Sequence, residues 1–166
     1  MIERHLGCME RRAMAMPAMQ AEMVKRLELL RARTSSDFAA VASSGQEADR
    51  MVRWICGSGN GNERFLHMKE KAGAGIAGWV VRHGRPLAIG GTQEDAEQRR
   101  REYPIMLAEN LLAAVAVPIR SAADIVGVLL IGSRTARDYV PAEVLLLERE
   151  ADRYAATCAG GAGQMV

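Results

Sequence analysis

Residues 111–132 read LLAAVAVPIRSAADIVGVLLIG. Two apolar runs, Leu112 to Arg120 and Ile125 to Gly132, flank a short turn from Ser121 to Asp124. Apolar runs of this length on both sides of a polar turn are typical of a β-hairpin. We therefore expect two antiparallel strands that are neighbours in one sheet.

The chain before this hairpin predicts a helix followed by a second hairpin. Short apolar runs at 38–42 and 51–56, separated by a polar turn at 43–50, indicate the second hairpin. The helix is expected to begin near Pro17 and to end near Ser35, because apolar residues recur there at spacings of three and four. This apolar face consists of Met19, Met23, Leu27 and Leu30.

The segments between the hairpins are shorter. Residues 65–68 are expected to be extended, residues 76–83 to form a helix that stops at Gly84, and residues 85–89 to form a strand. Residues 92–102 predict a polar helix capped by Thr92, and an irregular turn follows at 104–106.

A last helix is expected after Pro141 and should run to about Cys158. Its apolar residues alternate three and four apart, which suits a seam between two helices. These residues are Val144, Leu147, Ala151, Tyr154 and Cys158. The seam therefore predicts a homodimer through the terminal helices.

Composition favours one globular domain in the cytoplasm. The chain has 166 residues, a formal net charge of +2 and a hydrophobic fraction of 49%. Its dense basic cluster, Arg99 to Arg101, lacks the interleaved aromatics of a nucleic-acid surface, and its longest apolar run is too short for a bilayer span. No secretory signal is evident. We expect a lead-in at 1–16, a single domain at 17–160 and a flexible tail at 161–166, with neither nucleic acid nor membrane as a partner.

The helix start near Gly75 is a candidate seat for an anion. The first amides of a helix have no partner within it, and the helix dipole places partial positive charge there. Gly73, Gly75 and Gly78 allow a ligand to approach the backbone. The alternative is that this segment is only a tight turn and a helix that packs on the core.

Four motifs resemble the GAF family: GIAGWVV at 75–81, HGRPL at 83–87, VPI at 117–119 and IVGVL at 125–129. The resemblance covers residues 18–159 and implies an α+β fold, with a central antiparallel sheet between layers of helices. Within the family, the chain looks most like the stand-alone nitrate receptors of two-component systems. That likeness implies a nitrate-responsive switch that modulates a sensor histidine kinase.

The same resemblance implies the residues of the nitrate site. In these receptors a tryptophan on the second hairpin strand and backbone amides at the glycine-rich helix start hold the anion. Transferred to this chain, they are Trp54, Gly75, Ile76 and Ala77, with Met106 or its neighbour Ile105 from the later loop. Nitrate is flat and weakly hydrated, so a small apolar pocket with a few amide donors and an indole suits it.

Other functions stay open. Trp54 can be a core aromatic, and the chain can be a GAF scaffold for dimerisation or a sensor of another small molecule. Reduction of free methionine sulfoxide, an activity of other GAF proteins, needs cysteines in the central part of the domain, and none lies between Cys56 and Cys158. The cyclic-nucleotide string Asn-Lys-x-Phe-Asp-Glu is absent. We expect no catalytic residues, no metal site and no cofactor.

Overall fold

The computed structural model describes residues 20–44, 51–92 and 94–163, with side chains up to residue 155. The predicted lead-in at 1–16, most of the turn at 43–50 and the last three residues lie outside the described residues. Six strands form one sheet in the order β3-β2-β1-β6-β5-β4. Their bounds are β1 Phe38–Ser44, β2 Val52–Ser58, β3 Lys69–Glu70, β4 Leu87–Ile89, β5 Ala113–Ser121 and β6 Asp124–Ser133.

Both predicted hairpins are confirmed. Strands β5 and β6 pair antiparallel from Ala113 opposite Ser133 to Ser121 opposite Asp124. Strands β1 and β2 also pair antiparallel, and β1 lies against β6 in the centre of the sheet. The two hairpins are therefore joined side by side, with the short strands β3 and β4 at the two edges.

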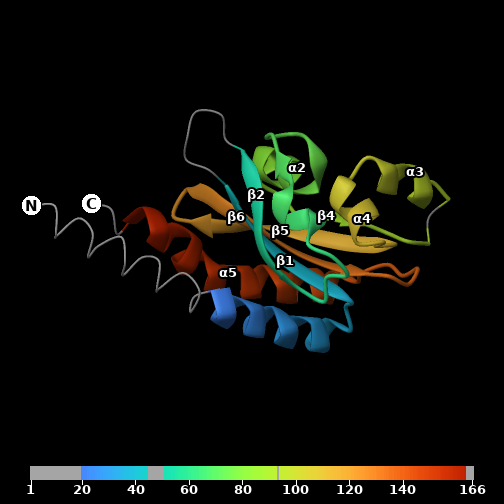
Figure 1. The fold of residues 1–166 in the computed structure, drawn as a ribbon, viewed down its shortest axis with the longest axis horizontal. Helices are drawn as coiled ribbons and strands as arrows, with labels where there is room; N and C mark the ends of the chain where they lie inside the picture. The colour runs from blue at the N-terminus through green and yellow to red at the C-terminus, as the bar shows by residue number, and fades with distance from the viewer. Residues whose placement is uncertain (1–19, 45–50, 93, 164–166) are drawn as a thin grey trace, which may run out of the picture.

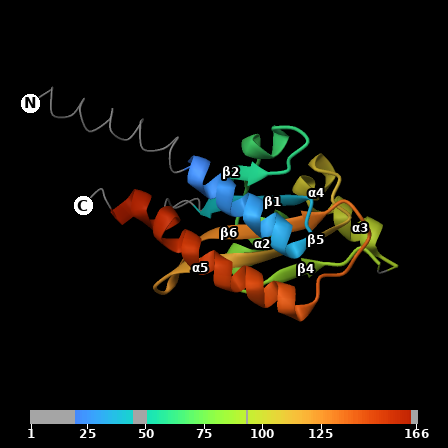
Figure 2. The same cartoon turned by 90° about the horizontal axis from the view of Figure 1, so that it is seen from below.

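Helices cover both faces of the sheet, as the three-layer prediction requires (Figure 1). One face carries η1 Arg64–His67, α2 Gly75–His83, α3 Ala96–Arg101 and α4 Pro104–Ala108. The other carries the N-terminal helix, described from residue 20 to residue 34, and α5 Pro141–Gly163. These last two run side by side in front of the sheet in Figure 2, which views the molecule from below. None of the described helices is long and apolar enough to cross a bilayer.

The predicted helix seam packs within the chain. Leu147, Ala151 and Tyr154 of α5 are buried in one core cluster with Leu27 and Leu30 of the N-terminal helix. Because the sheet already covers this seam, the expectation that it pairs two subunits is wrong for these residues. The helix also continues to Gly163, beyond the predicted end at Cys158 and into the predicted tail.

Three short segments differ from the sequence prediction. Residues 64–67 form a 3₁₀ turn, not an extended segment, because Phe65 turns inward to meet Phe38 edge to face with ring centroids 5.3 Å apart. Helix α3 begins at Ala96, and Thr92 bonds to Asp138 through its hydroxyl instead of capping that helix. The predicted irregular turn at 104–106 is the first part of α4, which begins with a proline and buries its next two residues.

Candidate functional site

Helix α2 forms the centre of the candidate site, and glycines bound it at both ends. Gly75 begins the helix with φ +73°, and Gly84 ends it with φ +65°, where its amide donates to the Val80 carbonyl at 2.8 Å. Left-handed backbone at these positions favours glycine. Ile76, Ala77 and Val80 are buried against the sheet, so the helix start faces the core.

The start of α2 is occupied by the carboxylate of Glu70. Its Oε2 accepts hydrogen bonds from the Ala77 amide at 3.0 Å and from the Gly78 amide at 3.2 Å. A Cβ on Gly75 would lie 2.5 to 2.7 Å from the same carboxyl group. The expectation that these first amides lack a partner is therefore wrong for Ala77 and Gly78. The Glu70 carboxylate therefore lies at the position where the sequence predicted an external anion.

Strand pairing explains why Glu70 points inward. Edge strand β3 pairs with β2, and Glu70 lies directly opposite Val52. Residues opposite each other in a ladder share a face, and Trp54, two positions along β2, points to that same face. Glu70, Val52 and Trp54 are accordingly all buried, whereas Lys69 and Arg53 are exposed on the other face.

The hydrogen bonding of the Glu70 carboxyl at the helix start is incomplete, and its pKa is raised. Burial raises the pKa of the Glu70 carboxyl, and the amides of Gly78 and Ala77 and the Trp54 side chain oppose that rise. The Trp54 indole lowers the pKa of the Glu70 carboxyl although its N–H does not meet the geometry of a hydrogen bond. Among the described residues, Trp54 Nε1 and Glu70 Oε1 are buried polar atoms without a hydrogen-bond partner.

The structure brings the predicted site residues into one core cluster. Its members include Trp54, Ile76, Ala77, Ile105 and Met106. Gly75 is half-buried at the helix start. All of these side chains are apolar except for the indole N–H, so the amides and the indole are the donors of the site.

Sequence reasoning missed Glu70. The residue lies between two lysines in a stretch that resembles a solvated loop. The signal that could have revealed Glu70 is its position five residues before Gly75. A carboxylate at that position can fold back onto the first amides of the helix. Local sequence did not reveal that residues 69 and 70 pair with β2.

A buried ion pair holds α4 beside this site. The Glu109 carboxylate follows α4, is fully buried and accepts from Arg134 at 2.8 Å and from the Gly61 amide at 2.8 Å. Arg134 also donates to the carbonyls of Glu109, at 2.9 Å, and of Gly59, at 3.0 Å. These bonds tie the end of α4, and with it Ile105 and Met106, to the loop after β2 and to the residues after β6.

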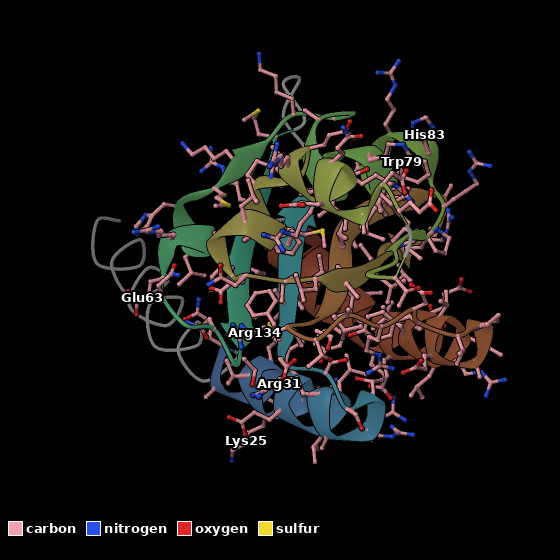
Figure 3. The ribbon with its side chains drawn as sticks, turned by 90° about the vertical axis from the view of Figure 1, so that its right-hand side faces the viewer. Lys25, Arg31, Glu63, Trp79, His83 and Arg134 are labelled. Atoms are coloured by element: carbon pink, nitrogen blue, oxygen red, sulfur yellow. The ribbon has the colours of Figure 1, made fainter. Side chains whose placement is uncertain are left out.

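The outer face of α2 carries aromatic and basic side chains. Trp79 is half-buried, and its ring centroid lies 4.3 Å from that of His83; Figure 3 shows the two side by side, away from Arg134. The Arg85 guanidinium lies 5.9 Å from the Trp79 ring centroid. Trp79 thus packs partly on the core and partly on its neighbours at the surface.

Two other features bear on alternative chemistries. The described residues contain no group of three or more His, Cys, Asp or Glu side chains that could hold a metal ion. Cys56 is buried on β2 within the core cluster that faces α5. A surface cavity of about 350 Å³ lies apart from the Glu70 region, between α5 and β5, and Arg120, Leu145 and Asp152 contribute to its lining.

Comparisons with known proteins agree with this architecture. The sequence model of the GAF domain matches residues 19–157. A mutated NreA protein from Staphylococcus aureus, altered in its nitrate-binding site, is 32% identical over 71% of this chain and 87% of that one, with a TM-score of 0.64. The hypothetical protein SA1058 from S. aureus is 31% identical over 70% of this chain and 96% of that one, with a TM-score of 0.63.

More distant relatives share the fold alone. A free methionine-R-sulfoxide reductase from Neisseria meningitidis is 15% identical over 88% of this chain and 80% of that one, with a TM-score of 0.66. A comparison with curated protein sequences finds no match. The family match spans most of the chain, and it agrees with the sheet order and with the helices on both faces. The chain therefore belongs to the GAF domain family.

Proposed function

We propose that this GAF domain is a non-enzymatic sensor of a small planar oxyanion, nitrate in the first place. The observation that carries the proposal is the hydrogen bonding of Glu70, whose carboxylate oxygen lies on two backbone amides at the start of α2. Nitrate resembles a carboxylate in being flat, singly charged and bounded by oxygen acceptors. A site that holds one through amides at a helix start has the donors needed for the other.

Two further points support nitrate. Trp54 Nε1 is a buried donor without a hydrogen-bond partner in the described part of the chain. The Trp54 side chain already lowers the pKa of the nearby Glu70 carboxyl, so the indole N–H lies within reach of an oxygen anion at the helix start. NreA, about 30% identical to this chain, is a protein with a nitrate-binding site.

The proposed output is control of a sensor histidine kinase in the cytoplasm. An anion at the start of α2 contacts β2, α2 and α4 together, so it changes the surface that these elements present. A ligand shifts such an equilibrium only by its difference in affinity between the two states. The kinase must therefore dock preferentially to one of them.

Titration of purified protein with sodium nitrate tests the proposal. The chain has two tryptophans, so the Trp79→Phe variant leaves Trp54 as the fluorescence reporter. We expect saturable heat in calorimetry and a matching change in Trp54 fluorescence. Sodium chloride is the salt control, and Trp54→Phe should weaken binding. The proposal fails if neither the wild type nor a Glu70→Gln variant responds to millimolar nitrate.

A second candidate is a GAF scaffold that forms homodimers. The self-occupied site favours it, because a site filled by Glu70 needs no external ligand. Leu29 on the N-terminal helix and Leu145 on α5 are 66% and 50% exposed, which leaves apolar surface on both terminal helices. Under this function, thermal melting stays flat across a panel of anions and nucleotides, and sedimentation equilibrium gives a dimer that Leu145→Glu weakens.

A further inference from the structure

Glu70 combines features that are unusual for a structural carboxylate. It is 6% exposed and lies on β3, a two-residue strand at the edge of the sheet. In the described part of the chain, no arginine, lysine or histidine forms an ion pair with it, and its hydrogen bonds come from two backbone amides, with the Trp54 side chain nearby. A buried charge usually has an ionic partner, because desolvation penalises it otherwise.

The site is only partly satisfied by this occupant. One carboxylate oxygen takes both amides, whereas Glu70 Oε1 and Trp54 Nε1 are left without partners although Trp54 is 2% exposed. The unmatched donor and the unmatched acceptor lie close enough for the Trp54 side chain to lower the Glu70 pKa, and the Glu70 side chain is tethered to β3. A free anion with three oxygens has no such tether, so it can satisfy the amides and the indole together.

Glu70 and an external anion exclude each other. Both need the Ala77 amide, and two negative charges this close together in a largely buried site repel strongly. The carboxylate must therefore leave the helix start when the anion binds. The edge position of β3 makes that movement feasible, since the next residues, 71–74, are exposed and the strand pairs with β2 alone.

We propose that Glu70 is a tethered competitor: its carboxylate occupies the anion seat in the ligand-free chain and is displaced when the anion binds. The inference rests on the proposed function and names Glu70 as the residue that sets the affinity of the site for the anion. Displacement also supplies the conformational signal. When the carboxylate leaves, Glu70 and the segment from Lys71 to Ala74 change position next to the outer face of α2.

Two variants separate competition from a structural role. Glu70→Gln keeps the shape of the side chain and its acceptor oxygen but removes the charge. Glu70→Ala removes the occupant and opens the seat. Glu63→Gln is the matched control, because Glu63 is an exposed glutamate in the loop before η1.

The first measurement is nitrate affinity by calorimetry. We expect Glu70→Gln to bind nitrate about tenfold more tightly than the wild type, which corresponds to about 1.4 kcal/mol, and Glu63→Gln to bind like the wild type. Equal affinity in the wild type and in both Glu70 variants overturns the competitor and leaves the proposed function standing. Absence of binding in every variant overturns both.

The second measurement is chemical rescue and needs no signalling partner. In Glu70→Ala, sodium formate and sodium nitrate should both raise the thermal midpoint with concentration, since each anion fills the vacated seat. The wild type, whose seat is occupied, should respond less to formate. A formate effect of the same size in the wild type and in Glu70→Ala contradicts occupation of the seat by Glu70.

Discussion

Replacing Arg134 by alanine tests how firmly the α4 side of the site is held. The change leaves the fully buried Glu109 carboxylate without its cation and removes the guanidinium donors to two backbone carbonyls. Breaking one half of a buried pair costs about 3–5 kcal/mol. Because the Arg134 side chain is 34% exposed and partly screened by solvent, we expect the lower end, about 3 kcal/mol.

Urea and thermal unfolding followed by circular dichroism measure this cost. For a domain of this size, 3 kcal/mol lowers the midpoint by about 10 °C. Arg101→Ala is the control, since its ion pair with Glu97 is 71% and 79% exposed and should contribute less than about 1 kcal/mol. In the double variant Arg134→Ala with Glu109→Gln, part of the stability should return, because no unpaired charge stays buried. Equal losses for Arg134→Ala and Arg101→Ala, or strict additivity in the double variant, would refute this reasoning.

Two further predictions concern the turn of α2 that holds the carboxylate. Gly78→Ala should lower stability by about 2–3 kcal/mol in urea unfolding, because its Cβ would lie 2.1 Å from the Lys71 carbonyl oxygen, whereas Gly61→Ala, with no contact closer than 3.8 Å, should change little. Burial raises the pKa of Glu70 above 4.5, so the folded chain binds an extra proton and the wild type should gain stability relative to Glu70→Gln as pH falls toward that value. Melting both proteins across a pH series checks the sign, and a wild type that loses stability relative to Glu70→Gln on acidification contradicts it.

Periodicity alone predicted the elements whose formation depends on neighbours in the sequence. The strands at 112–120 and 125–132 are separated by a short polar turn. Helix α2 ends at Gly84 because only glycine readily adopts the left-handed conformation found there. The same patterns failed where a distant partner decided the outcome. Phe65 turned a predicted extended segment into a 3₁₀ turn by packing on Phe38, and the apolar seam of α5 proved to face its own sheet.

The chemistry of the site divides in the same way. The glycine-rich start of α2 could be inferred locally, as could a tryptophan on the second hairpin strand, but the expectation that its first amides lack a partner was wrong for Ala77 and Gly78. The occupant could not be inferred locally, because Glu70 reaches these amides only when β3 pairs with β2 and turns the side chain toward Trp54. Strand pairing is a long-range event with no local signature in two residues. Sequence thus located the helix start, and tertiary structure decided that the Glu70 carboxylate lies on its amides.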